Sequence, residues 1–130
     1  MKFLLDTHVW IWLLANPQNL STAFKEKIEG PGTELWLSPI SIWETMILAE
    51  KKRISLQPNP SQWVRQALGS YPFREAPINH EISIKSREID LPHRDPADRF
   101  LAATALIYEL TLVTADKHLQ SASWLSTMKV

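Results

Sequence analysis

Short apolar runs alternate with longer segments of helical periodicity along this chain, and this alternation constrains the fold more than any other feature. Residues 2–5 form a short apolar run after Lys2, and a helical pattern of Val9, Trp10, Leu13 and Leu14 follows. Residues 34–38 and a helical pattern from Pro39 to about residue 53 repeat this order. Strands that alternate with helices usually lie side by side in a parallel sheet. We therefore expect an α/β fold with a mostly parallel central sheet.

The rest of the chain continues the same plan. Helical patterns cover residues 21–29, 58–69, 80–89 and 95–110, with Ser21 as the N-cap of the first and Asn59 or Ser61 as that of the second. Strand-like runs cover residues 73–76, 111–114 and, at an edge of the sheet, 128–130, and a short helical turn begins at Asp116. The sheet should therefore contain four to five strands.

The length and composition indicate one globular domain. With 130 residues, 45% of them hydrophobic, the chain can bury one core, so we expect a single domain over residues 1–130. It contains no cysteine, which excludes disulfides and thiolate metal sites and fits a reducing compartment. Asp6 and His8 interrupt the apolar N-terminal stretch, and residues 9–15 are too few to span a bilayer. We expect a cytoplasmic protein with an intact N-terminus and no membrane contact.

The formal net charge of +0 excludes a strong overall field that would attract a polyanion. A polyanion must therefore be held by local basic patches, which the sequence offers at residues 51–53, at His93, Arg94 and Arg99, and at Lys117 with His118. Each patch is equally well explained as a solvated helix end.

Acidic residues directly follow two of the predicted strands. Asp6 comes after residues 3–5, and Asp116 comes after residues 112–115. The functional crevice of an open α/β sheet lies at the carboxyl ends of its strands, so both carboxylates should lie at this edge. Either aspartate alone is also explained as a helix N-cap.

The sequence Asp95-Pro96-Ala97-Asp98 begins the clearest helix. Asp95 suits the N-cap, and we expect it to be mainly a cap with a supporting role at the site. Asp98 shares a helix face with the small residues Ala102 and Ala105, and small residues let a helix approach the sheet closely. The Asp98 carboxylate should therefore point toward the crevice.

Glu44 falls within the apolar arc of its helix, together with Ile40, Trp43 and Ile47. Burying an unpaired carboxylate costs several kcal/mol, so this side chain needs a cation or a strong hydrogen-bond donor nearby. The alternative is that Glu44 leaves the arc and pairs with a basic residue of the patch at 51–53.

Four converging carboxylates would repel one another unless a divalent ion lay among them. Ligation by oxygen alone selects Mg²⁺ or Mn²⁺, and the four histidines show no zinc-type spacing with these acids. Such a site activates water for phosphodiester hydrolysis and neutralises charge on the phosphate. The hydroxyls of Thr7, Ser38 and Thr114 lie at the same predicted edge and could orient a carboxylate, a water or a phosphate.

Four motifs resemble those of the PIN-domain family, most closely its VapC-type toxins. They are LLDTH from Leu4, SPISIWE from Ser38, DPADRFLAATA from Asp95 and LVTAD from Leu112, and the resemblance covers essentially the whole chain. Each motif alone is weak, but their order and spacing together are specific.

The resemblance implies a three-layer α/β/α sandwich and endoribonuclease activity that depends on Mg²⁺ or Mn²⁺. It places the metal-binding acids at Asp6, Glu44, Asp98 and Asp116, with Thr114 as a polar neighbour. It also implies a homodimer and a small cognate antitoxin as inhibitor. RNA would be the substrate, with Arg99 and Lys117 as the basic residues we expect to contact it.

Two tryptophans in the first predicted helix cannot both face the core. Trp10 and Trp12 are about 200° apart around a helix of 3.6 residues per turn. We assign one of this pair to a contact with a protein partner, because aromatic residues are enriched at interfaces. Packing of the second ring beneath a loop explains the pair equally well.

Two other functions compete with a nuclease. A phosphatase would use Asp6 as a nucleophile, but it usually carries a second aspartate two residues later, where this chain has His8. A catalytically silent protein-binding or RNA-binding module would keep the fold without needing all four acids. With 3 glycines in the chain, a glycine-rich phosphate loop is excluded.

Overall fold

A computed structural model describes residues 1–92 and 95–130 of the chain. Over this part, five strands form one sheet in the order β3-β2-β1-β4-β5, and each neighbouring pair is parallel. The strands are β1 (Lys2–Leu5), β2 (Glu34–Leu37), β3 (Arg74–Glu75), β4 (Thr111–Val113) and β5 (Thr127–Met128). The expected mostly parallel sheet is confirmed, and its last strand begins one residue earlier and ends two residues earlier than predicted.

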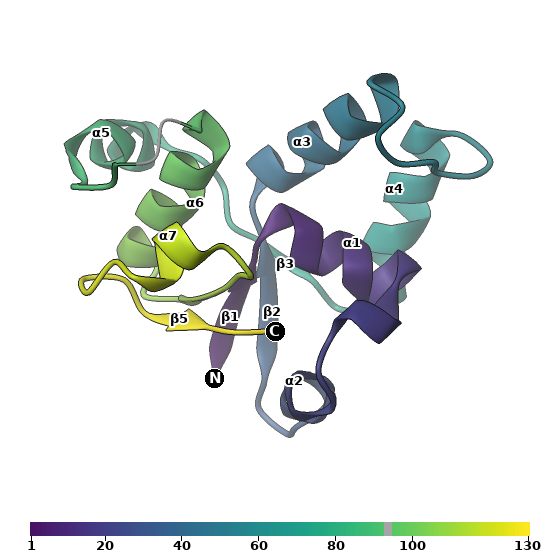
Figure 1. Ribbon diagram of the computed structural model, residues 1–130, viewed down its shortest axis with the longest axis horizontal. Coiled ribbons are helices and arrows are strands. Elements are labelled where there is room, and N and C mark those ends of the chain that lie inside the picture. The colour runs from purple at the N-terminus through teal and green to yellow at the C-terminus, as the bar shows by residue number, and fades with distance from the viewer. Residues whose placement is uncertain (93–94) are drawn as a thin grey trace.

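Helices connect the strands, as Figure 1 shows. They are α1 (Thr7–Ala15), α2 (Thr22–Ile28), α3 (Pro39–Glu50), α4 (Pro60–Ser70), α5 (His80–Glu88), α6 (Pro96–Ile107) and α7 (Lys117–Gln120), with a short 3-10 helix η1 (Pro17–Asn19) that the sequence did not predict. The predicted helices α3 and α6 end earlier than expected. Lys52 and Glu109 adopt left-handed φ angles of 58° and 55°, which an α-helix does not contain.

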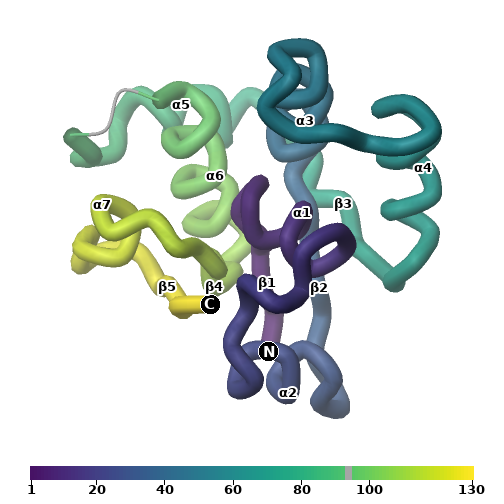
Figure 2. The backbone as a smooth tube through the Cα atoms, turned by 45° about the vertical axis from the view of Figure 1, so that its right-hand side comes forward, coloured from purple at the N-terminus to yellow at the C-terminus, as the bar shows by residue number. Residues whose placement is uncertain are grey.

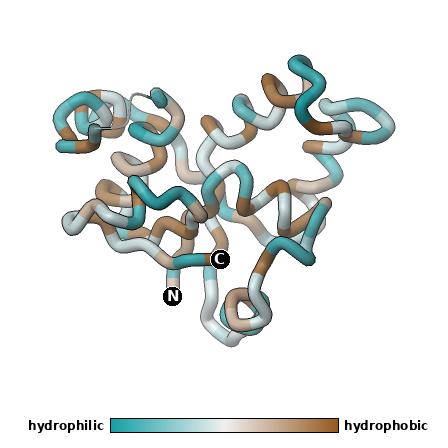
Figure 3. The backbone as a smooth tube through the Cα atoms, viewed as in Figure 1, coloured by the Kyte–Doolittle hydropathy of each residue, from teal (hydrophilic) through white to brown (hydrophobic). Residues whose placement is uncertain are grey.

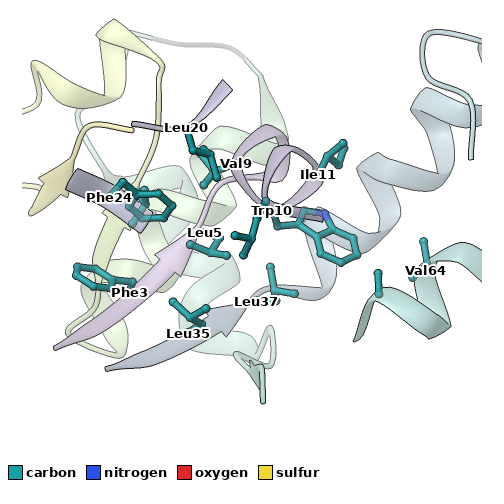
Figure 4. Packing of buried hydrophobic residues seen from close by; sticks show 13 residues of the cluster. Phe3, Leu5, Val9, Trp10, Ile11, Leu20, Phe24, Leu35, Leu37 and Val64 are labelled. Carbon is teal, nitrogen blue, oxygen red and sulfur yellow. The ribbon is translucent and has the colours of Figure 1, made fainter. Parts of the chain in front are cut away.

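The sheet buries both of its faces. Side chains alternate along β1, so Phe3 and Leu5 join one hydrophobic cluster and Leu4 joins the other. The first cluster, drawn in Figure 4, includes residues of α1, α2 and α4, namely Val9, Trp10, Phe24 and Val64. The second includes Leu101, Ala102 and Ala105 of α6, and Leu119 of α7. Helices therefore cover both faces, which confirms the three-layer α/β/α architecture.

Side chains cap most of these helices, which explains where they begin. Ser21, Asn59 and Asp95 accept hydrogen bonds from backbone N–H groups at the starts of α2, α4 and α6, as the sequence predicted. Asn79 caps α5 in the same way. No helix within residues 1–92 and 95–130 combines the length and apolar character needed to cross a membrane.

Helix α3 is rotated relative to the prediction from its apolar arc. Its fully buried residues are Ser41 and Thr45, whereas Trp43 is 57% exposed. The reason is a polar contact with α1: Trp10 Nε1 donates to Thr45 Oγ1 at 3.0 Å, and the hydroxyls of Thr7 and Ser41 are hydrogen-bonded at 3.1 Å. The expectation that Trp43 lies within a buried arc was therefore wrong.

Candidate active site

The four acids predicted from the sequence line one cleft of about 370 Å³. They come from four places in the chain: Asp6 joins β1 to α1, Glu44 lies in α3, Asp98 lies in the first turn of α6, and Asp116 precedes α7. Figures 1 and 2 show the junction of β1 and α1 between α3 and α6. The parallel topology thus brings acids that are up to 110 residues apart to one end of the sheet.

Asp6 does not use its side chain to cap α1, although it occupies the N-cap position. The residue is 8% exposed, and its Oδ2 accepts a hydrogen bond from Thr114 Oγ1 at 2.6 Å. The same hydroxyl oxygen accepts from the Asp116 backbone N–H at 3.0 Å, so Thr114 links the two strand ends. Burial raises the pKa of Asp6, and the nearby Asp116 adds to this effect, while the Thr114 hydrogen bond and His8 oppose it.

Glu44 is half-buried and reaches across to α1, where it accepts a hydrogen bond from Thr7 Oγ1. Glu44 thus contacts α1, whereas the alternative interpretation of the sequence paired it with the basic residues 51–53 at the end of its own helix. Burial raises the pKa of Glu44, and the charges of Asp95 and Asp6 raise it further, while the Thr7 hydrogen bond and His8 oppose the rise.

Asp98 is 9% exposed and belongs to the face of α6 that carries the buried Ala102 and Ala105, as the sequence predicted. Asp95 caps the same helix by accepting from the Ala97 N–H at 3.0 Å, and it also lines the cleft. Asp116 likewise combines two roles. Its Oδ1 caps α7 by accepting from backbone N–H groups at 2.8 and 3.1 Å, as the N-cap explanation predicts. The residue also lines the cleft.

Three other predicted site residues have structural roles away from the acids. Ser38 is buried, caps α3 through Ile40, and lies outside the residues that line the cleft. The Arg99 guanidinium donates to three backbone carbonyls at and after the end of α5, at 2.7 to 3.0 Å, so we correct its assignment from an RNA contact to a structural one. Trp10 is 0% exposed within the core, which rules it out as a partner contact.

Two aromatic residues also line the cleft, and the sequence analysis did not place them there. His8 and Trp12 line the cleft together with the carboxylates. Their spacing of four residues on one helix was the available signal, because it puts both rings on one face of α1. Lys117 is exposed beside Asp116, whereas His93 and Arg94 lie outside the described residues.

The donor chemistry of this cleft fits a hard divalent cation. Its carboxylates are oxygen ligands of the kind that Mg²⁺ and Mn²⁺ prefer, and burial makes an uncompensated charge on Asp6 and Glu44 costly. Within residues 1–92 and 95–130, no three acidic or histidine side chains are grouped tightly enough to hold an ion as they are placed. The carboxylates would therefore have to turn toward one another to enclose one.

Comparison with known proteins identifies the same family as the sequence motifs do. A family model of the PIN domain matches residues 3–125. Ribonuclease VapC22 of Mycobacterium tuberculosis is 39% identical over 121 residues, which cover 91% of this chain and 89% of that protein.

Solved structures show the same fold at lower identity. VapBC2 from Rickettsia felis, solved bound to a promoter DNA fragment, matches with a TM-score of 0.76 and 12% identity, covering 99% of this chain and 98% of that chain. VapBC-1 from nontypeable Haemophilus influenzae matches with a TM-score of 0.74 and 21% identity over the same shares. Given the family match over nearly its whole length and the identity to one curated relative, this chain belongs to the PIN-domain family.

Proposed function

We propose that this chain is a Mg²⁺- or Mn²⁺-dependent endoribonuclease, the cytoplasmic toxin of a type II toxin–antitoxin pair. The observation that carries the proposal is that Asp6, Glu44, Asp98 and Asp116 line a single cleft. The identity of 39% to a protein named as a ribonuclease supports RNA as the substrate.

Asp6 and Asp98 would be the principal metal ligands, because both carboxylates are buried and line the cleft. Glu44 and Asp116 would complete the set from the opposite helix and the neighbouring strand end. When bound, the ion would activate water and neutralise charge on the scissile phosphate. Thr114 and Thr7 hold the Asp6 and Glu44 carboxylates through their hydroxyls, and Lys117 would attract the RNA phosphates.

The direct test is cleavage of structured RNA with Mg²⁺ or Mn²⁺ and with a chelator. Asp6→Asn and Asp98→Asn should each abolish cleavage, because each replaces a charged ligand by a neutral amide of the same shape. Asp90→Asn is the matched control, since Asp90 is exposed and does not line the cleft.

The outcomes of this assay separate the competing functions. Metal-independent cleavage that survives both substitutions would contradict the proposal. No cleavage by the unmodified protein would favour the silent binding module. Phosphate-monoester hydrolysis that Asp6→Asn alone abolishes would favour the phosphatase.

We also propose that the protein forms a homodimer and binds a small antitoxin. The structural neighbours were solved as complexes named VapBC, and Trp43 and Ile84 leave large apolar side chains 57% and 52% exposed. A short DNA-binding protein encoded beside this gene should co-purify with the chain and suppress its cleavage of RNA. Light scattering after size-exclusion chromatography would give the mass of each species, and a monomer at all concentrations would contradict the dimer.

A further inference from the structure

We propose that the Trp12 indole, with the His8 imidazole inclined beside it, forms an aromatic platform on which one nucleobase of a single-stranded RNA stacks, beside the carboxylates of the cleft. This proposal rests on the proposed ribonuclease function and adds a base-binding subsite to it. The platform is defined by these two side chains, which belong to the first two turns of α1.

The geometry of α1 places both rings on the rim of the acid cleft. The ring centroids of His8 and Trp12 are 6.0 Å apart with planes inclined by 51°, and both residues line the cleft that contains Asp6 and Asp98. The intervening Trp10 faces the opposite way and is wholly buried. About half a turn of helix thus separates a core indole from an indole at the cleft.

The packing of Trp12 suits a fixed stacking surface. The residue is half-buried and packs against the hydrophobic cluster of α1, α2 and α4, while it also lines the cleft. An aromatic ring that is held by the core on one side loses little freedom when a ligand stacks on it. His8, in contrast, is exposed and forms the outer end of the platform.

The chemistry of the cleft favours a nucleobase as the occupant. A phosphodiester at the carboxylates carries its own base, and the aromatic rings lie in the same cleft of about 370 Å³. Single-stranded RNA is recognised largely by stacking of unpaired bases on aromatic side chains. Stacking does not depend on charge, so it can hold RNA at a cleft whose carboxylates repel phosphate. The platform should accept any base, because every base has a flat π-face.

The test compares cleavage of short single-stranded RNA by the unmodified protein and by two variants of the platform. Trp12→Leu removes the ring but keeps apolar packing, whereas Trp12→Phe keeps a smaller ring. Stacking of one base typically contributes about 5- to 150-fold in affinity. We expect Trp12→Leu to lower kcat/KM about 10-fold and Trp12→Phe to restore most of it. Trp124→Leu, at a half-buried residue that lies away from the cleft, is the matched control.

A second readout distinguishes stacking from a general change in structure. Oligonucleotides with an abasic site at each successive position should show one position where the missing base lowers kcat/KM. At that position the loss should disappear in Trp12→Leu, because the two changes remove the same contact. Mn²⁺ affinity, measured by calorimetry, should be the same in both proteins.

Each remaining outcome has a definite meaning. If the unmodified protein cleaves RNA and Trp12→Leu cleaves it equally well, the platform is wrong and the ribonuclease stands. If Trp12→Leu loses only antitoxin binding, the ring is a protein contact instead. If the unmodified protein does not cleave RNA, the proposed function fails. RNA carrying 2-aminopurine then tests the platform by itself, since absence of stacking-induced quenching on binding would overturn it.

Discussion

Replacing Asp6 by asparagine should stabilise the metal-free protein, even though it removes a ligand of the proposed metal. Asp6 is 8% exposed, and burial is the largest cause of the raised pKa of its carboxylate, so the charge of this group opposes folding when no cation is present. Asparagine removes the charge and keeps an oxygen that can accept from Thr114 Oγ1.

The size of the effect is the difference between two contributions. Changing a charged acceptor to a neutral one weakens the Thr114 hydrogen bond by about 1 kcal/mol. Relief of the buried charge, which costs several kcal/mol when unpaired, exceeds this loss, and we expect a net gain of about 1–2 kcal/mol. For a chain of 130 residues, 1 kcal/mol corresponds to about 4 °C in melting temperature, so Asp6→Asn should melt about 4–8 °C higher in chelator.

In divalent metal, the unmodified protein should melt at a higher temperature than Asp6→Asn. Metal at about 100 times its dissociation constant stabilises the folded state by about 2.7 kcal/mol, or about 10 °C for this chain. The unmodified protein should gain this stability and the variant little of it. Thermal melts followed by circular dichroism in chelator and in excess Mn²⁺ would measure both shifts, with Asp90→Asn as the control. A lower melting temperature of Asp6→Asn in chelator would refute the reasoning.

Three further predictions concern the effect of pH on stability, the role of Thr114 and the role of Arg99. Folding stabilises the protonated forms of Asp6 and Glu44, whose pKa values lie above their ordinary 3.8 and 4.5. The stability that these protonated carboxyls add is complete below their ordinary pKa values and is lost as pH rises through the raised ones. The urea midpoint in chelator should therefore fall toward neutral pH, and it should fall less in Asp6→Asn. Thr114→Val removes the hydroxyl that holds Asp6 and should weaken Mn²⁺ binding about 10- to 100-fold by calorimetry, whereas unchanged affinity would count against this role. Arg99→Met removes donors to the carbonyls at the end of α5 and should lower the free energy of unfolding by about 2 kcal/mol, while Arg87→Met, at an exposed residue of α5, should change it by less than about 0.5 kcal/mol.

The sheet and the position of the acids follow from local patterns that the sequence states clearly. Short apolar runs and period-3.6 patterns set the element types, and parallel topology then requires Asp6 and Asp116 to lie at one edge. The caps Ser21 and Asp95 were equally readable, because a capping bond depends only on neighbouring residues.

Properties that depend on contacts between distant elements were less predictable. The rotation of α3, which exposes Trp43, follows from hydrogen bonds between α1 and α3 and not from the hydrophobicity of α3 itself. Figure 3 shows both apolar and polar stretches along this helix, and its buried residues Ser41 and Thr45 are polar, so hydrophobicity alone does not identify its buried face. Arg99 was misassigned for a similar reason, because its carbonyl partners lie up to 13 residues earlier in the chain.

Acids from four separate places in the chain should bind one divalent metal ion in the cleft. An anomalous difference map from crystals soaked in Mn²⁺ tests it most directly. We predict a peak inside the cleft, at roughly 2.0–2.3 Å from oxygens of both Asp6 and Asp98, with Glu44 or Asp116 turned toward it. A fully soaked crystal with no peak in the cleft, or with a peak that these carboxylates do not contact, would contradict the account.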